Sequence, residues 1–105
     1  MIRNMETCDW QVSRIDEAGL QQIAIYLQSL IANHEIGEWF TARDLVGRNQ
    51  IEWANTPPLN LITIHYSSQS TQKTILGKIL KKTIFDLPII YELNMDFVAH
   101  YRRLE

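Results

Sequence analysis

Four lysines lie within the stretch 70–85, which contains no aspartate or glutamate. If successive residues are placed about 100° apart, as on an α-helix, the apolar residues gather on one side and most of the lysines on the other. A cationic helix face of this kind is suited to phosphate groups, because lysine and the helix N-terminus both attract anions. The same pattern also fits a helix face that contacts only water. The residues on this helix that we expect to contact a polyanion are Thr71, Gln72, Lys73, Thr74, Lys78, Lys81 and Lys82.

Catalytic and metal chemistry have little support in the sequence. His34, His65 and His100 are dispersed, and none has a metal-ligand spacing to Cys8 or to a carboxylate. The Gly-Lys pair at 77–78 lacks the upstream glycine of a phosphate-binding loop. We therefore expect no enzyme activity, no metal site and no cofactor.

Length and composition are those of one globular domain spanning 1–105. Of its 105 residues, 46% are hydrophobic and 21% are charged, and no internal repeat divides them. Cys8, the one cysteine, has no partner for an internal disulfide, which favours a reducing compartment and a cytoplasmic location. No apolar run approaches the roughly 18 residues needed to cross a bilayer, and the N-terminus has no export signal, so we expect no membrane partner.

The charge of the chain is polarised along the sequence. Residues 1–68 carry four arginines against eight acids, whereas residues 69–105 carry six basic residues against four acids. The net charge of −2 argues against strong non-specific binding to nucleic acid, but the positive part is centred on 70–85.

The first third of the chain predicts an arm, a helix and a brief strand. Apolar and polar residues alternate over 8–12, which is typical of a short extended arm, and we expect this arm to span 1–14. A capping-box spacing that starts at Ser13 predicts an amphipathic helix over 16–33. The aromatic run at 38–40 predicts a short strand.

A second capping-box spacing, at 41–44, predicts a short helix that starts at Ala42 and ends at Gly47. The mostly polar residues 48–55 predict a loop. The segment 59–66 fits either a helical stripe or a β-branched strand, and we favour a helix because Thr-Pro precedes it as a start signal.

The last third predicts the basic helix and a hairpin. Ser70 is the expected N-cap of the helix 70–85, and two β-prone runs within 87–104 predict a hairpin that turns at 94–96. The apolar side of the basic helix predicts core contacts for Ile75, Leu76, Ile79, Leu80 and Ile84.

This order of elements resembles the winged helix-turn-helix superfamily. The likeness is carried by residues 39–47, by 76–82 and by the end of the hairpin, 101–103. It covers roughly 15–104 and implies an α+β fold with three to four helices, a short strand and a C-terminal β-hairpin wing. The chain departs from the simplest pattern because 22 residues, 48–69, separate the short helix from the basic one.

The resemblance implies a bacterial or phage regulator of transcription that binds double-stranded DNA. The helix 70–85 would lie in the major groove as the recognition helix, and the hairpin 87–104 would be the wing. Arg102 and Arg103 would add wing contacts to phosphate, although in a regular strand they point to opposite faces. The alternative is that both arginines are charged residues that protect an exposed edge strand from pairing with another chain.

The alternative is a winged-helix protein-interaction module, an adaptor or inhibitor of another protein such as a phage counter-defence factor, that binds no DNA. The acidic net charge favours this alternative, as does the absence of arginine from the basic helix. Many proteins of this class form homodimers, for which the helix 16–33 and the arm carrying Trp10 are the expected surfaces.

Overall fold

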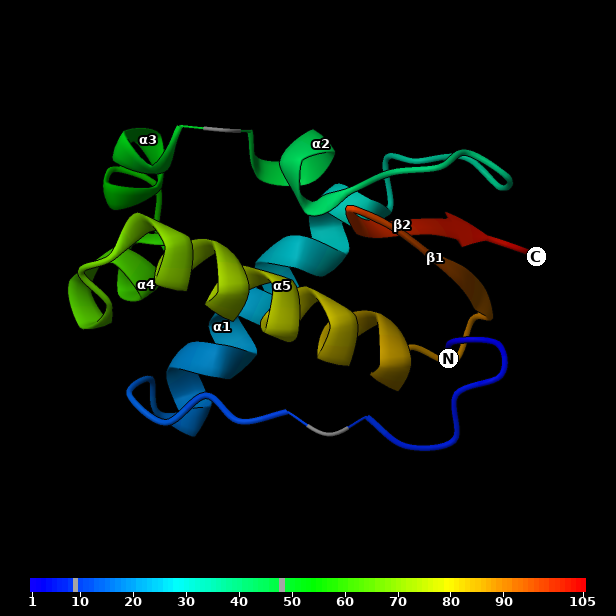
Figure 1. The fold of residues 1–105 in the computed structure, drawn as a ribbon, viewed down its shortest axis with the longest axis horizontal. Coiled ribbons are helices and arrows are strands. Elements are labelled where there is room, and N and C mark those ends of the chain that lie inside the picture. The colour runs from blue at the N-terminus through cyan, green and yellow to red at the C-terminus, as the bar shows by residue number, and fades with distance from the viewer. Residues whose placement is uncertain (9, 48) are drawn as a thin grey trace.

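The computed structural model describes residues 1–8, 10–47 and 49–105 and has an α+β fold (Figure 1). Within those residues five helices are followed by one antiparallel hairpin, so the expectation of three to four helices is wrong. The elements are α1 (Glu17–Ile31), α2 (Ala42–Val46), α3 (Gln50–Ala54), α4 (Asn60–His65), α5 (Gln69–Asp86), β1 (Tyr91–Asp96) and β2 (Val98–Arg103).

α1 and α5 are the two long helices, and they pack across each other (Figure 1). α1 begins after Asp16, whose Oδ1 accepts a hydrogen bond from the Gly19 N–H at 2.8 Å, and not after the expected Ser13. α5 begins after Ser68, two residues before the expected cap, Ser70. Burial of the predicted apolar side of α5 is confirmed for Ile75, Leu76, Ile79, Leu80 and Ile84.

The capping box predicted for α2 is confirmed. Thr41 Oγ1 accepts a hydrogen bond from the Asp44 N–H at 3.3 Å, and Asp44 Oδ2 accepts one from the Thr41 N–H at 2.9 Å. Gly47, with φ of 78°, follows the last helical residue in a conformation that favours glycine.

Two short helices occupy 50–65. α3 replaces most of the loop expected over 48–55, because Asn49 accepts a backbone N–H at 3.0 Å and so caps a helix there. Residue 48, the first residue of the expected loop, lies outside the described residues. The helical interpretation of 59–66 is confirmed by α4, but Thr56 does not cap it. Instead, Thr56 Oγ1 donates to the Glu52 carbonyl at 2.7 Å, at the end of α3.

The two hairpin strands pair along their whole length, and a single bridge extends the sheet on each side. On one side Phe40 forms an isolated bridge with Tyr101 of β2. A short strand was expected at 38–40, and within that range this one bridge is what forms. On the other side Ile2 pairs with Tyr91 of β1, so the start of the N-terminal arm lies along the hairpin.

The strands run further than predicted before the chain turns. Asp96 and Val98 are the last pair in register, so the turn is centred on Phe97 and not on 94–96. Phe97 has φ of 61°, a left-handed conformation that glycine and asparagine adopt more readily. A phenylalanine gives no turn signal, which explains the error.

One hydrophobic core joins the helices to the hairpin. Buried side chains come from α1, α3, α4, α5 and both strands, among them Ile23, Trp53, Ile62, Leu80, Tyr91 and Tyr101. Within the described part of the chain, no helix is both long and apolar enough to cross a membrane.

Candidate nucleic-acid interface

The solvent face of α5 carries the lysines that the sequence singled out. Lys73 and Lys78 are exposed and Lys81 is half-buried. Across the described residues, no carboxylate oxygen lies within 4.0 Å of these three ammonium groups. We call these residues the lysine triad. Its charge is directed to solvent and is not neutralised by ion pairs within the described chain.

Lys82 differs from the triad because it is already engaged. Its Nζ lies 3.1 Å from Asp86 Oδ1, one turn further along α5, and 5.3 Å from the centroid of the Phe85 ring. An ion pair at this spacing neutralises much of the local field. Lys82 is therefore a weaker candidate for phosphate than the sequence suggests.

Gln72 is the clearest departure from the predicted site. It is 6% exposed and turns into the molecule, where its Nε2 donates a hydrogen bond of 2.6 Å to the Tyr66 carbonyl. Gln50 of α3 makes a similar contact, donating from Nε2 to the Gln69 carbonyl at 2.7 Å. The two glutamines hold the connection between α4 and α5, so Gln72 positions the start of α5 and does not face a ligand.

The two threonines of the predicted site remain on the outer surface of α5. Thr71 and Thr74 are both exposed, and Thr74 Oγ1 donates back to the Ser70 carbonyl at 3.1 Å. Gly77 lies between the two lysines Lys73 and Lys81 along the helix, and a Cβ built there meets no atom within 4 Å. This part of the helix surface is therefore open to close approach.

The two hairpin arginines make contacts within the chain. Arg102 donates from Nε and Nη2 to Glu92 Oε2, at 3.1 and 2.9 Å, and its guanidinium carbon lies 4.7 Å from the centroid of the Trp39 ring. Arg103 Nε donates to the carbonyl of Glu105. Both arginines thus have partners within the chain, and their role as wing contacts stays a prediction. Their predicted placement on opposite faces is confirmed by the register.

Glu92 is the residue that sequence reasoning missed at this place. It faces Arg102 across the hairpin, and its Oε2 also lies 3.5 Å from Nη2 of Arg3. A row of contacting side chains thus crosses the sheet, and it consists of Arg3, Glu92, Arg102 and Trp39. The pairing of Glu92 with Arg102 could have been predicted from the cross-strand register. A turn placed at 94–96 gives a different register, in which these two residues do not face each other.

The hairpin tip is apolar. Exposed fractions are 67% for Met95, 104% for Phe97 and 53% for Val98. The charged side chain among them is Asp96, and residues 93–98 contain no lysine or arginine. The tip therefore lacks the basic character expected of a wing that binds phosphate, and the sequence analysis did not anticipate its exposed apolar side chains.

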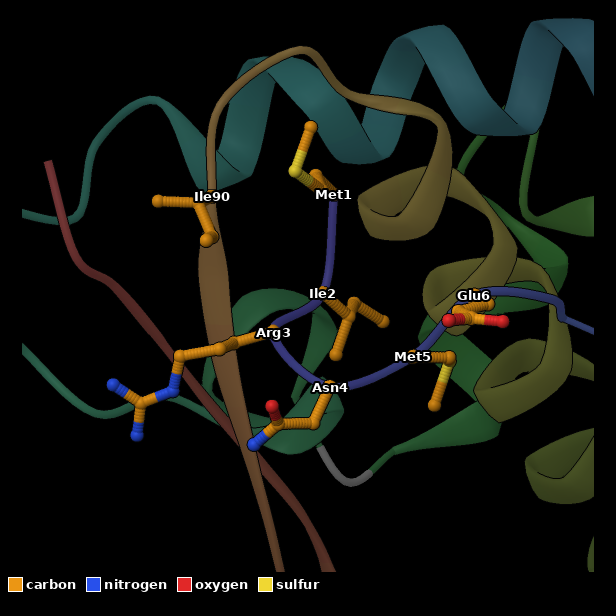
Figure 2. Close-up of a pocket in the computed structure, with 7 residues that line it drawn as sticks. All are labelled: Met1, Ile2, Arg3, Asn4, Met5, Glu6 and Ile90. Atoms are coloured by element: carbon orange, nitrogen blue, oxygen red, sulfur yellow. The ribbon is translucent and has the colours of Figure 1, made fainter.

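An open hollow on the described surface offers no convergent chemistry. Its volume is about 720 Å³, and it lies beside the first six residues and Ile90 (Figure 2). Figure 2 shows that Arg3 and Glu6, two charged side chains that line it, extend to opposite sides. A smaller cavity of about 210 Å³ lies between α1 and α5.

Burial raises the pKa of two tyrosines in the hairpin. Desolvation is the main cause for Tyr101, with Cys8 nearby acting in the same direction, whereas for Tyr91 the nearby Arg103 opposes the rise. Burial also lowers the pKa of the Met1 amine, against an opposing effect of Asp86. None of these groups lies on the lysine face.

Among the described residues, no three histidine, cysteine or acidic side chains gather as a metal ion would require. Comparison of the chain with protein-family models, with curated protein sequences and with solved structures found no match. The case for a function therefore comes from the geometry of this chain alone.

Proposed function

We propose that this chain is a winged-helix-like protein that binds double-stranded DNA through the solvent face of α5, as a cytoplasmic regulator of transcription in a bacterium or phage. The observation that carries the proposal is the lysine triad, three cations on one helix with no acidic partner among the described residues. Unpaired lysines on a helix that follows a short helix and precedes a hairpin suit contacts to phosphate.

The layout of the chain supports the proposal at the level of element order. A long helix, a single-residue bridge, a short helix, the basic helix and a hairpin follow one another, as in the pattern on which the resemblance rests. α3 and α4 lie between residues 50 and 65, within the segment where the chain is longer than that pattern.

The chemistry of the α5 surface favours phosphate contacts over base reading. Lysine is a point charge, and the face carries no arginine, which makes the commonest specific contact to guanine. The open surface at Gly77 permits close approach of a phosphate backbone. We therefore expect binding whose salt dependence is set by the three lysines and which depends only weakly on DNA sequence.

The test is a DNA mobility-shift titration at low salt with a variant in which Lys73, Lys78 and Lys81 are replaced by glutamine. We expect the wild type to retain duplex DNA and the triple variant to lose retention, because each lysine contributes a phosphate contact. Circular dichroism should show unchanged helix content, since the three side chains make no ion pair within the described chain.

Lys82→Gln is the matched control on the same helix. Because its ammonium group is paired with Asp86, we expect it to lower DNA affinity less than any one triad substitution. No retention of DNA by the wild type at low salt would refute the proposal. Retention by the triple variant equal to that of the wild type would mean that another surface binds DNA.

The second candidate is a winged-helix-like protein-interaction module, an adaptor or an inhibitor of another protein, that binds no DNA. The observation that favours it is the hairpin, whose arginines are engaged within the chain and whose tip exposes Met95, Phe97 and Val98. Exposed apolar patches often mark protein interfaces. A folded wild type that does not retain DNA at low salt would favour this candidate.

A further inference from the structure

The outer edge of β1 carries backbone groups that have no partner within the described chain. Tyr91 directs its N–H to the Met1 carbonyl and its own carbonyl to the Arg3 N–H, both at 2.8 Å, so these groups point away from β2. Because successive residues of a strand direct their backbone groups to opposite edges, Leu93 and Met95 point the same way as Tyr91. Among the described residues, neither makes a hydrogen bond at that edge.

The N-terminal arm covers only the first part of this edge. Asn4 has φ of 67°, and the Met5 N–H donates back to the Ile2 carbonyl at 3.1 Å, so the arm turns at this point. Figure 2 shows that the chain after Asn4 leads away from the strand. The last three residues of β1, 94–96, are accordingly exposed. The unpaired groups therefore continue an edge that already pairs with an extended segment.

The edge formed by β2 is more nearly complete. Tyr101 exchanges two backbone hydrogen bonds of 2.8 Å with Phe40, and the Arg103 carbonyl accepts one of 2.8 Å from the Gly37 N–H. Of the β2 residues that point outward, Ala99 is left without such a partner among the described residues. Each edge thus pairs with an extended segment of its own chain, and the longer unpaired run belongs to β1.

β1 also lacks the features that usually protect an edge strand. Residues 93–96 contain no lysine and no proline, and the pairing from Tyr91 to Asp96 continues without a bulge. An edge of this kind accepts a further strand readily, because the added backbone satisfies its N–H and carbonyl groups.

The side chains beside this edge define which strand would fit. On the inner face Leu93 is half-buried and Met95 is 67% exposed, whereas on the outer face β1 carries the carboxylates of Glu92 and Asp96 and no basic residue. Glu92 is paired with two arginines, but within the described chain no basic group lies within 4.0 Å of Asp96. An added strand would therefore place apolar side chains beside Met95 and a basic side chain beside Asp96.

We propose that the edge of β1 at Leu93 and Met95 binds an extended peptide segment of another protein, whose side chains alternate between apolar and basic. The segment pairs with these two residues as the arm pairs with Tyr91, and so becomes the next strand of the sheet. Backbone pairing gives the affinity, and the alternating side chains give the selectivity. Because the edge is short, binding is weak and reversible. It is independent of DNA binding, since it uses no residue of the lysine triad.

Amide hydrogen exchange measured by NMR tests the proposal with the full chain and a short synthetic peptide of alternating valine and lysine. In the free protein we expect rapid exchange at Leu93 and Met95 and slow exchange at Glu92 and Asn94, whose N–H groups face β2. At a peptide concentration ten times the dissociation constant, exchange at Leu93 and Met95 should slow by about tenfold. Because these two N–H groups point away from β2, their protection reports an added strand.

Protein variants separate the backbone contribution from the charge contribution. Met95→Pro removes the outward N–H and no bond between β1 and β2, a position at which an edge strand tolerates proline. We expect it to weaken peptide binding roughly 2- to 10-fold, the effect of one hydrogen bond, and the matched control Met95→Val to leave it unchanged. Slow exchange at Glu92 and Asn94 establishes that the hairpin is intact in each variant.

Asp96→Asn tests the charge without changing the backbone of the edge. We expect this variant to bind the valine–lysine peptide more weakly and a valine–serine peptide as well as the wild type does. The variant in which the lysine triad is replaced by glutamine should bind the valine–lysine peptide normally. Failure of DNA binding and failure of peptide binding are therefore distinguishable.

Three results would overturn the proposal. The first is unchanged exchange at Leu93 and Met95 with the valine–lysine peptide at millimolar concentration. The second is equal binding of the same peptide with methylated backbone nitrogens, which cannot donate hydrogen bonds to the edge. The third is protection of both amides at high protein concentration without peptide, together with a rise in mean mass, which would assign the edge to a second copy of this chain.

Discussion

At the scale of single residues, the buried glutamines carry the most information about how the candidate interface is built. Gln72 sits on the inner side of α5 among isoleucines and leucines, a place where an amide is costly unless it is paired. Its hydrogen bond to the Tyr66 carbonyl pays that cost and fixes the connection that leads into α5. Gln50 donates to the carbonyl of Gln69, the first residue of α5, at the end of the same connection.

We predict that Gln72→Leu lowers the free energy of unfolding by about 1–3 kcal/mol, because the Tyr66 carbonyl is left buried without a donor. Urea denaturation followed by circular dichroism measures the change. Gln28→Leu, an exposed site on α1, is the control and should change stability by less than about 0.5 kcal/mol. Equal effects of the two substitutions would contradict the positioning role.

A second prediction at this scale concerns pH. Burial raises the pKa of Tyr101 above the value near 10 that it has in the unfolded chain. Its stabilising contribution is fully present below pH of about 10 and is lost as pH rises toward the folded pKa, because only the unfolded chain releases the proton. We expect Tyr101→Phe to flatten the loss of stability above pH of about 10, measured by denaturation at several pH values. The same slope in the variant and the wild type would contradict this assignment.

At the scale of elements, α5 is a helix with two chemically different sides. Seven of its residues are buried against the core, while the lysine triad and Gly77 lie toward solvent. The two glycines that occur within helices test this division because their surroundings differ. A Cβ at Gly77 meets nothing within 4 Å, whereas a Cβ at Gly19 in α1 would lie 2.9 Å from Ile15 Cγ2 and 3.2 Å from Leu61 Cδ1.

We predict opposite effects of alanine at the two positions. Gly77→Ala should raise the free energy of unfolding by up to about 1 kcal/mol, because alanine favours the helix and meets no atom there. Gly19→Ala should lower it by about 1–3 kcal/mol, because the added methyl group would overlap Ile15, just before α1, and would crowd Leu61 of α4. Thermal and urea unfolding measure both, and a destabilised Gly77→Ala would mean that this face is covered.

At the scale of the whole molecule, the candidate interface is a small cationic face on an acidic chain. The net charge of −2 gives no long-range attraction to DNA, so the triad must act through local contacts. Wing contacts would have enlarged this face, but Glu92 and Trp39 occupy Arg102.

This electrostatic arrangement predicts a shallow salt dependence of DNA binding. Each neutralised phosphate contributes a slope of about −0.9 to a plot of log affinity against log salt, so three lysines give about −2.7. Lys78→Gln should bring the slope to about −1.8, and Lys82→Gln should change it by much less, as measured by fluorescence anisotropy. A wild-type slope much steeper than about −2.7 would mean that further cations contact DNA.

Much of the fold follows from local signals in the sequence. The apolar side of α5, the capping box of α2 and the hairpin were all predicted, because helix periodicity and the Thr41–Asp44 spacing act within a few residues. The limits of the elements were less predictable. Ser13, Thr56 and Ser70 all look like caps, and only the folded chain determines which candidate residue serves as the cap of each helix.

The candidate site divides in the same way. The sequence alone determined that lysines gather on α5 with no acid among them, since that depends only on helical spacing. Tertiary structure decided that Gln72 turns inward, that Glu92 and Trp39 hold Arg102, and that Phe97 stands in solvent at the hairpin tip. These outcomes depend on which distant residues meet across a packed core or a strand register, and no local pattern encodes that choice.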